Sequence, residues 1–384
     1  MQFSRSQSIE KALHPKRILI IYGPRRVGKT TLLNAYLGQQ HNKRILSVVG
    51  DNVRVQEVFD TRALDTLKRF VSGYDIVAID EAQQVPHIGI GAKMLIDAFP
   101  EKQFILTGSS SFDLSNQVGE PLTGRHFRVT LLPIAQQEML AGTFELTGAL
   151  PDFLLYGSYP EILLAPDSST KERILDELVS SYLYKDVLAL DWIKSPALLR
   201  DIARMIAFQI GHDVSLNEIA VALNTTVHTV ARYLDLLEKM FVLKRVRGFS
   251  RNLRNEISKK ARYYFLDNGV RNAVIGQFSP LSSRADVGAL WENFIFTEFL
   301  KRDGIEGIRS EYYFWRTHTG SEIDIVRESG GRIDAYECKW SPRAKARKPA
   351  AFGNAYPEAS FAVITPENYL DFLLKNPPPS NSNS

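Results

Sequence analysis

The segment RILIIYGPRRVGKTTLLNAYLG, residues 17–38, decides the fold of the amino-terminal part of the chain. It starts with an apolar run typical of a buried strand and ends with a run of helix-forming residues. Between them, GPRRVGKT fits the spacing G-x-x-x-x-G-K-[ST], in which glycines let the backbone wrap closely around phosphate oxygens. The segment therefore predicts a strand, a phosphate-binding loop (P-loop) and a helix whose amino terminus faces negative charge.

The residues of this loop have predicted tasks in binding ATP. Lys29 would reach the β- and γ-phosphates, and the hydroxyl group of Thr30 would bind Mg²⁺. The alternative, a glycine-rich turn without a ligand, is disfavoured by the strand and the helix on either side. The residues expected to contact the nucleotide are Gly23, Pro24, Arg25, Arg26, Val27, Gly28, Lys29, Thr30 and Thr31.

A second element supports a nucleotide site. In DIVAIDEA, residues 75–82, mostly apolar residues precede an acidic pair. A strand that ends in this way would place Asp80 among the magnesium ligands and Glu81 beside the attacking water. The alternative is a strand that ends in a solvated acidic pair.

The next predicted strand, FILTGSSS at residues 104–111, ends in hydroxyl groups. Ser109 or Thr107 could contact the γ-phosphate or orient the attacking water, and we take Ser109 as the catalytic candidate of the two. The alternative is a helix cap, in which Ser110 or Ser111 caps the segment that follows.

The order of strand-like and helical stretches predicts the fold class. Residues 17–133 alternate between the two, which argues for an α/β fold with a parallel sheet and helices on both faces. From about residue 150 to 240 the pattern is mostly helical, and from about residue 285 a helical stretch precedes several strands. The predicted units are residues 1–145, 146–250 and 251–375, followed by a disordered tail at residues 376–384.

Composition places the chain among ordinary globular proteins. Its 384 residues are 44% hydrophobic and 23% charged, with a formal net charge of +4. The single cysteine, Cys338, excludes an internal disulfide and a cysteine-based zinc site. No apolar run approaches the roughly 18 residues of a membrane span, and the first residues lack the apolar core of a signal peptide. We therefore expect a cytoplasmic protein that makes no contact with a membrane.

The segment SLNEIAVALNTTVHTVARYLDLLEKMFVL, residues 215–243, resembles a helix-turn-helix. Two apolar stripes are separated by Asn224 and Thr225. The second helix would present polar side chains outward, with Arg232 among them as a contact with DNA. Such a unit can also serve only for packing inside the protein, and the sequence leaves both roles open.

The next segment, KRVRGFSRNLRNEISKKAR at residues 244–262, contains eight basic residues and one acidic residue, Glu256. Its position directly after the helix-turn-helix suits a wing or arm that lies along phosphates. Arg251 and Arg254 are the expected contacts with DNA. The alternative is a solvated charged face.

The segment GSEIDIVRESGGRIDAYECKW, residues 320–340, predicts two strands around a two-residue turn at Gly330–Gly331. In this register Asp324 lies opposite Glu337, and directly opposed carboxylates repel each other. A magnesium ion between them would relieve the repulsion, and Lys339 on the same face would steady developing charge. One face of the hairpin would then be charged and the other, with its isoleucines, apolar.

Over about residues 15–340, the chain resembles a bacterial and archaeal family of AAA-type ATPases. The stretches that carry the resemblance are GPRRVGKTTLL, DEAQ, LTGSSS, LTGRHFRVTLLPIAQQE, YGSYPEILL, YLYKDVL, TVARYLDLLEKMFVL, YYFLDNGVRN, LWENFIFTEF and GSEIDIV. In that family the ATPase is followed by a carboxyl-terminal domain of formerly unknown function that looks like PD-(D/E)XK nucleases. The resemblance implies a helical and winged-helix middle domain and a last domain with a restriction-endonuclease-like α/β fold.

The resemblance also implies further site residues. LTGR recurs in the family, so Arg125 would sense the γ-phosphate, and as an arginine finger it would act from a neighbouring subunit of a homo-oligomer. The alternative is that Arg125 pairs with a carboxylate of its own domain. Nucleases of this kind commonly place another carboxylate on the preceding helix, where Glu292 matches and Glu298 is the second choice. The implied second metal site consists of Glu292, Asp324 and Glu337 with Lys339.

Together these features predict an ATP-hydrolysing motor that acts on DNA. The first domain would drive motion, the middle domain would contact phosphates, and the last would hold a branched structure such as a Holliday junction. Three alternatives stay open for the hairpin: a site that cuts DNA, a DNA-binding fold that does not cut, and an ordinary hairpin stabilised by its lysine. A nucleotide-gated switch whose carboxyl-terminal modules bind a protein partner is the alternative function.

Overall fold

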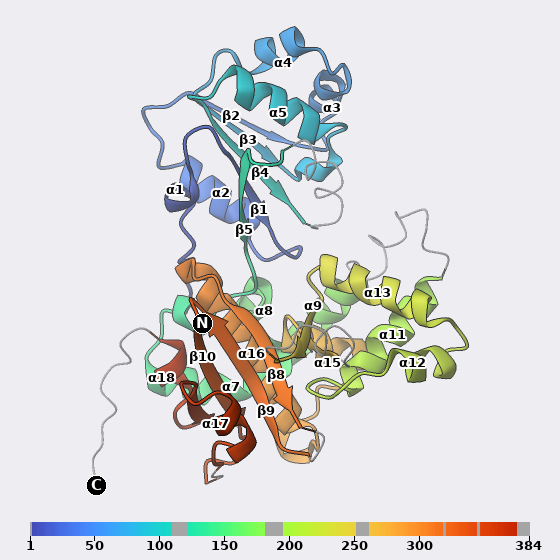
Figure 1. Ribbon diagram of the computed structural model, residues 1–384. Helices are drawn as coiled ribbons and strands as arrows, with labels where there is room; N and C mark the ends of the chain where they lie inside the picture. Colours follow the sequence, from blue (N-terminus) through green and yellow to red (C-terminus); the bar gives the residue numbers. More distant parts are fainter. Residues whose placement is uncertain are drawn as a thin grey trace. The chain divides into compact units, whose positions relative to one another are not determined.

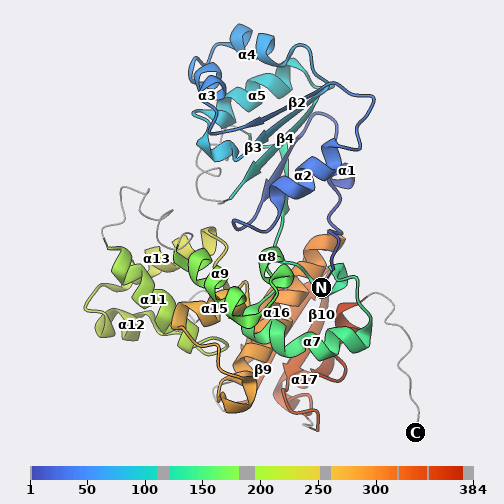
Figure 2. The same cartoon turned by 180° about the vertical axis from the view of Figure 1, so that it is seen from behind.

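The computed structural model describes residues 2–109, 122–180, 195–250, 261–317, 320–343 and 346–374 (Figures 1 and 2). The chain divides into two compact units. The amino-terminal unit consists of Arg5–Leu132 with Lys239–Phe241, and the carboxyl-terminal unit of Met1–Ser4, Pro133–Glu238 and Val242–Ser384. The tail predicted at residues 376–384 lies outside the described residues, as do Arg251 and Arg254.

A five-stranded parallel sheet organises the amino-terminal unit, as the sequence predicts. The strand order is β2-β3-β4-β1-β5, and all neighbours run parallel. The strands are β1 (Ile18–Tyr22), β2 (Ile45–Val49), β3 (Ile76–Asp80), β4 (Gln103–Gly108) and β5 (His126–Thr130). The helices that flank the sheet are α1 (Ile9–Ala12), α2 (Lys29–Leu37), α3 (Val53–Asp60), α4 (Leu64–Val71) and α5 (Ile88–Ala98), with the 3₁₀ helix η1 (Ala82–Gln84) after β3 (Figure 1).

The core of this unit lies between the sheet and the helices α3 to α5. Ile18 and Ile20 of β1 are fully buried and share a cluster with Phe59 of α3 and Leu95 of α5. β1 and β3 are buried along their whole length, as expected for strands inside a parallel sheet that is covered by helices. The strand order brings the carboxyl ends of β3, β4 and β1 side by side, and the P-loop begins at this edge.

Helices dominate the first half of the carboxyl-terminal unit. In the described residues none of its helices, and none of the other unit, is long and apolar enough to cross a membrane. The helices are η2 (Gln136–Glu138), α7 (Thr143–Tyr156), α8 (Pro160–Leu164), α9 (Ser168–Ser180), α11 (Pro196–Phe208), α12 (Leu216–Ala222), α13 (Val227–Lys239), α15 (Asn268–Ile275), η4 (Leu281–Ser283), α16 (Val287–Glu306), α17 (Ala350–Ala355) and α18 (Tyr369–Leu373).

A six-stranded mixed sheet completes this unit. Its order is β11-β10-β9-β8-β6-β7. The strands are β6 (Leu243–Gly248), β7 (Ala261–Phe265), β8 (Glu311–Arg316), β9 (Glu322–Ser329), β10 (Arg332–Cys338) and β11 (Ser360–Ile364). The long helix α16 packs on the face that carries Ile325 and Tyr336 and supplies Trp291 and Phe299 to a shared core.

The winged helix is continuous with this sheet. α12 and α13 form the predicted helix-turn-helix, the antiparallel pair β6–β7 follows, and Val214 bridges to Ala261. β6 also runs parallel to β8, with Arg247 opposite Tyr313. The division predicted near residue 250 therefore passes through one sheet, and the three-domain division remains a prediction.

The β9–β10 hairpin has the predicted turn and, next to the turn, the predicted register, but the predicted pair of Asp324 and Glu337 lies beyond the paired residues. Both residues of the Gly330–Gly331 turn have positive φ, 57° and 84°, as a type I′ turn requires. The pairing runs from Arg332 opposite Ser329 to Tyr336 opposite Ile325.

The predicted division of this hairpin into an apolar and a charged face is wrong. Ile325 joins the core cluster under α16, whereas Ile323 joins a different cluster. The cause is an irregularity in the pairing of β9 with β8, whose register shifts between Tyr313 and Trp315. Such a shift changes which way the following side chains point.

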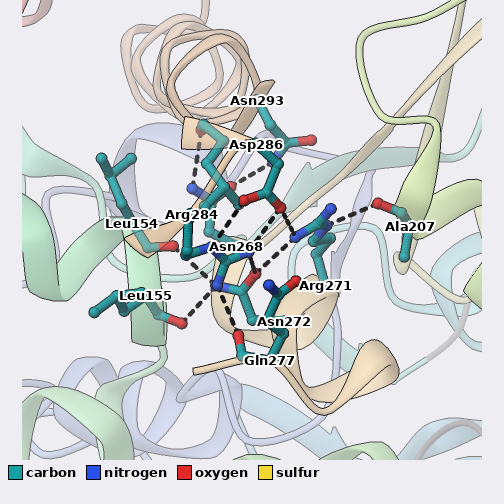
Figure 3. A network of polar contacts seen from close by, with 11 residues as sticks. Leu154, Leu155, Ala207, Asn268, Arg271, Asn272, Gln277, Arg284, Asp286 and Asn293 are labelled. Carbon is teal, nitrogen blue, oxygen red and sulfur yellow. Dashed lines mark hydrogen bonds and ion pairs between the residues drawn. The ribbon is translucent and has the colours of Figure 1, made fainter. Parts of the chain in front are cut away.

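A buried polar network ties α15 to its neighbours (Figure 3). Asp286 accepts hydrogen bonds from Arg271 at 2.6 Å and from Arg284 at 2.7 and 2.8 Å. Asn272 accepts from both arginines and donates to backbone carbonyl groups near the end of α7. Arg271 also donates to the carbonyl of Ala207 in α11 at 2.8 Å. The YYFLDNGVRN stretch thus has a structural task, because it joins three helices.

Candidate functional site

The P-loop connects β1 to α2 and depends on its two glycines. Gly23 and Gly28 have φ of 152° and 92°, values that favour glycine. A Cβ atom on Gly23 would lie 2.0 Å from the carbonyl oxygen of Leu131, so this position also has no room for a side chain. The loop therefore keeps its backbone close to the sheet and directs the chain into α2.

Lys29 is held at the start of α2. Its side chain is 5% exposed, and Nζ donates hydrogen bonds to the carbonyl oxygens of Gly23 at 3.0 Å and Pro24 at 2.9 Å. Burial lowers its pKa to about 8, although the nearby carboxylates of Glu81 and Asp80 favour the charged form. An anion bound at the loop would favour the protonated, positively charged form of this buried lysine.

Asp80 links the P-loop to two strands. Thr30 Oγ1 donates to Asp80 Oδ2 at 2.6 Å, and Thr107 Oγ1 donates to Asp80 Oδ1. Thr107 is fully buried and also accepts from the backbone N–H of Glu81 at 3.0 Å. Thr107 therefore positions the acidic pair. Of the two hydroxyl candidates, Thr107 lies within β4, whereas Ser109 directly follows the carboxyl end of that strand. The oxygen atoms of Thr30 and Asp80 fit the ligand preference of Mg²⁺.

Glu81 begins a small buried cluster that the sequence analysis did not identify in full. Its backbone is left-handed, with φ of 49°. Gln83 Nε2 donates to Glu81 Oε2 and to Ser109 Oγ, the latter at 3.1 Å. Gln83 was missed as a site residue because its role depends on the contact between β3 and β4, although DEAQ places it two residues after Glu81.

The remaining P-loop candidates differ in exposure. Val27 is fully buried, and its carbonyl oxygen accepts a hydrogen bond from Arg5. Arg25, Arg26 and Thr31 are exposed.

Arg125 lies at the amino-terminal end of the strands, whereas the P-loop of its own unit lies at their carboxyl-terminal end. It directly precedes β5, which pairs with β1 from His126 opposite Ile18 to Thr130 opposite Tyr22. The P-loop follows Tyr22, so the length of these strands, roughly 13 Å, separates the two. Arg125 Nε donates to Asp97 Oδ1 at 2.8 Å, the pairing within its own domain that was the alternative in the sequence analysis.

The basic residues of the carboxyl-terminal unit that were expected to contact DNA differ in their exposure to solvent. On α13 Arg232 is exposed, and on β6 Lys244, Arg245 and Arg247 are exposed. Arg262, the last basic residue of the predicted arm, is 3% exposed and therefore does not belong to a surface that contacts phosphates.

Arg262 instead lies among acidic side chains. Its guanidinium nitrogens lie 3.5 Å from Glu292 Oε1, 3.1 Å from Glu322 Oε2 and 3.6 Å from Asp213 Oδ1. Glu292 also accepts a hydrogen bond from Tyr264 at 2.6 Å. Burial and the charge of Asp324 raise the pKa of Glu292 to about 8. Arg262 lowers the pKa of Glu292, but burial and Asp324 outweigh it, so the protonated form of Glu292 is favoured at neutral pH.

The carboxylates of the hairpin lie next to this group. Asp324 Oδ2 accepts the backbone N–H of Cys338 at 2.8 Å, and Lys339 Nζ donates to Glu337 Oε1 at 2.6 Å. Burial, followed by the charge of Glu337, raises the pKa of Asp324 to about 6. In the described parts of the chain, no three histidine, cysteine, aspartate or glutamate residues form a group that could hold a metal ion. The second metal site stays a prediction.

Glu298, the second choice for that site, has a structural role. It is 2% exposed, pairs with Lys301 at 2.7 Å and accepts the backbone N–H of Gln136 at 2.7 Å. These contacts attach the segment before α7 to α16.

Comparisons with known families divide the chain into three matches. Residues 15–140 match the model of an AAA domain. Residues 147–281 and 287–373 match two domains of unknown function, DUF8612 and DUF4143 respectively.

Similar whole proteins are uncharacterized. One from Haemophilus influenzae is 28% identical over 308 residues, which cover 74% of each chain. One from Mycobacterium tuberculosis is 25% identical over 335 residues, 86% of this chain and 72% of the relative. One from Methanocaldococcus jannaschii is 25% identical over 345 residues, 84% of this chain and 74% of the relative.

Among solved structures, AMPPCP-bound DnaA from Aquifex aeolicus is similar with a TM-score of 0.27 and 18% identity, over 58% of this chain and 82% of that chain. Domain III of the replication initiation protein DnaA from Thermotoga maritima has a TM-score of 0.26 and 16% identity, over 56% and 88% of the two chains.

Proposed function

We propose that this protein, whose residues 15–140 form an AAA-type P-loop domain, hydrolyses ATP and uses hydrolysis to act on DNA. The observation that carries the proposal is the hydrogen bond from Thr30 to Asp80 at 2.6 Å. It brings the last residue of the P-loop motif to the acid at the end of β3, where the two oxygens would share a magnesium ion.

Each residue of the site would have one task. Lys29 would bind the β- and γ-phosphates, and Thr30 and Asp80 would hold Mg²⁺, which screens the phosphate charge. Glu81 would accept the proton of the attacking water, with Ser109 close to the γ-phosphate. The buried position of Lys29 supports this, because a phosphate would provide the negative charge that favours its protonated form.

Exposed positive charge on the winged helix supports DNA as the partner. Arg232 on α13 and Lys244, Arg245 and Arg247 on β6 are the described residues that would contact phosphates, with Arg251 and Arg254 as further candidates. A branched substrate such as a Holliday junction rests on the family resemblance. A homo-oligomer rests on Arg125, which would reach the nucleotide of a neighbouring copy.

A second candidate activity concerns the acidic residues of the carboxyl-terminal unit. Burial is the main cause of the raised pKa values of Glu292 and Asp324, and the charge of a neighbouring carboxylate raises each further. This grouping of carboxyl groups favours the second activity, because a divalent cation would favour their ionised forms. Such a cation would hold a DNA phosphate against Lys339, and cleavage would need it there. A fold that holds DNA without cutting makes the same contacts but leaves the phosphodiester bond intact.

ATP hydrolysis and DNA binding can be measured on the same preparation. Phosphate release by wild type and by Lys29→Ala tests the first part, and filter binding of junction, fork and duplex DNA at several salt concentrations tests the second. We expect hydrolysis that Lys29→Ala abolishes, and DNA binding that weakens steeply with salt. Hydrolysis without salt-dependent DNA binding would favour a nucleotide-gated switch with a protein partner.

A further inference from the structure

Gln83 joins the ends of two neighbouring strands at the candidate hydrolysis site. It lies on η1, directly after β3, and is 8% exposed. Its amide nitrogen donates both to the carboxylate of Glu81 and to the hydroxyl group of Ser109, which follows β4. β4 lies between β3 and the P-loop strand β1. One buried side chain thus connects the acid proposed to activate water with the hydroxyl group proposed to lie near the γ-phosphate.

The chemistry of the partners fixes how this amide is oriented. The carboxylate of Glu81 can only accept hydrogen bonds when ionised, so the NH₂ group of Gln83 must face it. The oxygen Oε1 then points the other way, where it is buried and has no hydrogen-bond partner among the described residues. An unpartnered buried oxygen is unfavourable. The two donated hydrogen bonds must therefore hold the side chain in place.

The two hydrogen bonds also make the positions of their acceptors interdependent. Glu81 is attached to β4 a second time, because its backbone N–H donates to Thr107 at 3.0 Å. The backbone of Glu81 is therefore held in place, so a movement of Gln83 would shift only the carboxylate group of Glu81. If Ser109 changes its hydrogen bonding when a phosphate binds, the amide of Gln83 must adjust, and the carboxylate of Glu81 adjusts with it.

We propose that Gln83 is a positioning residue. When Ser109 contacts the γ-phosphate, the amide of Gln83 adjusts and moves the carboxylate of Glu81 with it. Glu81 is then aligned with the attacking water only when a triphosphate occupies the site. This inference rests on the proposed function, since it needs hydrolysis at this site. It extends that function by giving the site a way to distinguish ATP from ADP before chemistry starts.

A double-mutant cycle tests the connection. Steady-state hydrolysis is measured for wild type, Gln83→Ala, Ser109→Ala and the double variant, with Gln83→Met as a variant that keeps the volume without the amide. We expect each single change to lower kcat by about 10- to 100-fold with KM within about 3-fold, as for loss of a group that acts in the transition state. The double variant should be no slower than the slower single variant, because both changes break one connection.

The neighbouring residue provides a matched control. Gln84 lies on the same 3₁₀ helix but is exposed, so Gln84→Ala should hydrolyse ATP at the wild-type rate. Multiplicative effects of Gln83→Ala and Ser109→Ala on kcat would overturn the proposal, as would normal kcat in Gln83→Met. If wild type itself releases no phosphate, the proposed function fails, and that result is distinct from an active wild type with active Gln83 variants.

Discussion

Lys29 is the residue whose charge responds most directly to a ligand. Its Nζ is surrounded by backbone carbonyl oxygens, and burial holds its pKa near 8 instead of the ordinary value of 10.5. Because the folded pKa is depressed, this lysine adds stability at high pH, and that stability is lost as pH falls through about 8. Bound phosphates would reverse the balance by favouring the ammonium form.

Nucleotide binding should therefore take up a proton at Lys29 near pH 8.5. Nucleotide-free protein is then partly deprotonated at this residue, and the triphosphate restores the charge. Titration calorimetry in two buffers of different ionisation enthalpy measures the uptake, and affinity should fall as pH rises above 8. The Lys29→Met variant should show no uptake from this source. Equal heats in both buffers for wild type would contradict the assignment.

Asp80 and Glu81 should differ in what their amide variants lose. Glu81→Gln should bind ATP normally but turn over at least about 100-fold more slowly, because only proton transfer from water is lost. Asp80→Asn should also weaken magnesium-dependent binding, since Asp80 lies 2.6 Å from the hydroxyl group of Thr30. Fluorescent-nucleotide titration with and without Mg²⁺ separates the two effects. Equal loss of binding in both variants would refute this division of roles.

At the scale of elements, the sequence predicted the features that depend on neighbouring residues, but it did not predict contacts between distant segments. The P-loop and the Gly330–Gly331 turn follow from a few neighbouring residues, and both have the expected form. Arg262 was counted with a basic surface, but β7 is buried along its length and turns this side chain toward three carboxylates. The shift between β8 and β9, like the contacts of Gln83, arises where distant strands meet. No periodicity within one segment encodes such a contact.

The hairpin itself yields a test with metal ions. Because its pKa is raised, Asp324 stabilises the fold at low pH, and this contribution is lost as pH rises through about 6. At pH 8 without nucleotide, Mg²⁺ or Mn²⁺ should raise the melting temperature of wild type by several degrees, since a ligand at 100 times its Kd contributes about 2.7 kcal/mol. Asp324→Asn should respond much less.

Two further variants delimit that result. Lys339→Ala should keep the metal response, because lysine is not a ligand, but should lose any cleavage of branched DNA. Asp371→Asn removes an exposed carboxylate on α18 and should behave as wild type. Melting of wild type that is independent of metal, together with intact branched DNA, would identify an ordinary hairpin.

At the scale of the whole molecule, the position of Arg125 bears on assembly. It lies at the end of the strands opposite the P-loop of its own unit, so if it contacts a γ-phosphate, we expect that phosphate to be bound to another copy of the chain. Contacts of this kind are heterologous, because a site on one face meets an arginine on a different face, and they close into rings or extend as filaments. The ion pair with Asp97 is partly exposed, with side chains 37% and 49% accessible, and contributes little stability.

Mixing two inactive variants should restore activity if Arg125 acts across such an interface. Arg125→Ala keeps its P-loop but gives no arginine to its neighbour, whereas Lys29→Ala keeps the arginine but cannot use a nucleotide. Random mixing in equal amounts would create a complete site at about one interface in four, so phosphate release should recover to roughly a quarter of the wild-type rate. Asp97→Asn serves as the control, because it removes the negative charge of the partner that accepts from Arg125 at 2.8 Å and leaves the arginine in place, and it should stay active. An active Arg125→Ala, or no recovery on mixing, would assign Arg125 to the pair with Asp97 alone and remove the main reason to expect an oligomer.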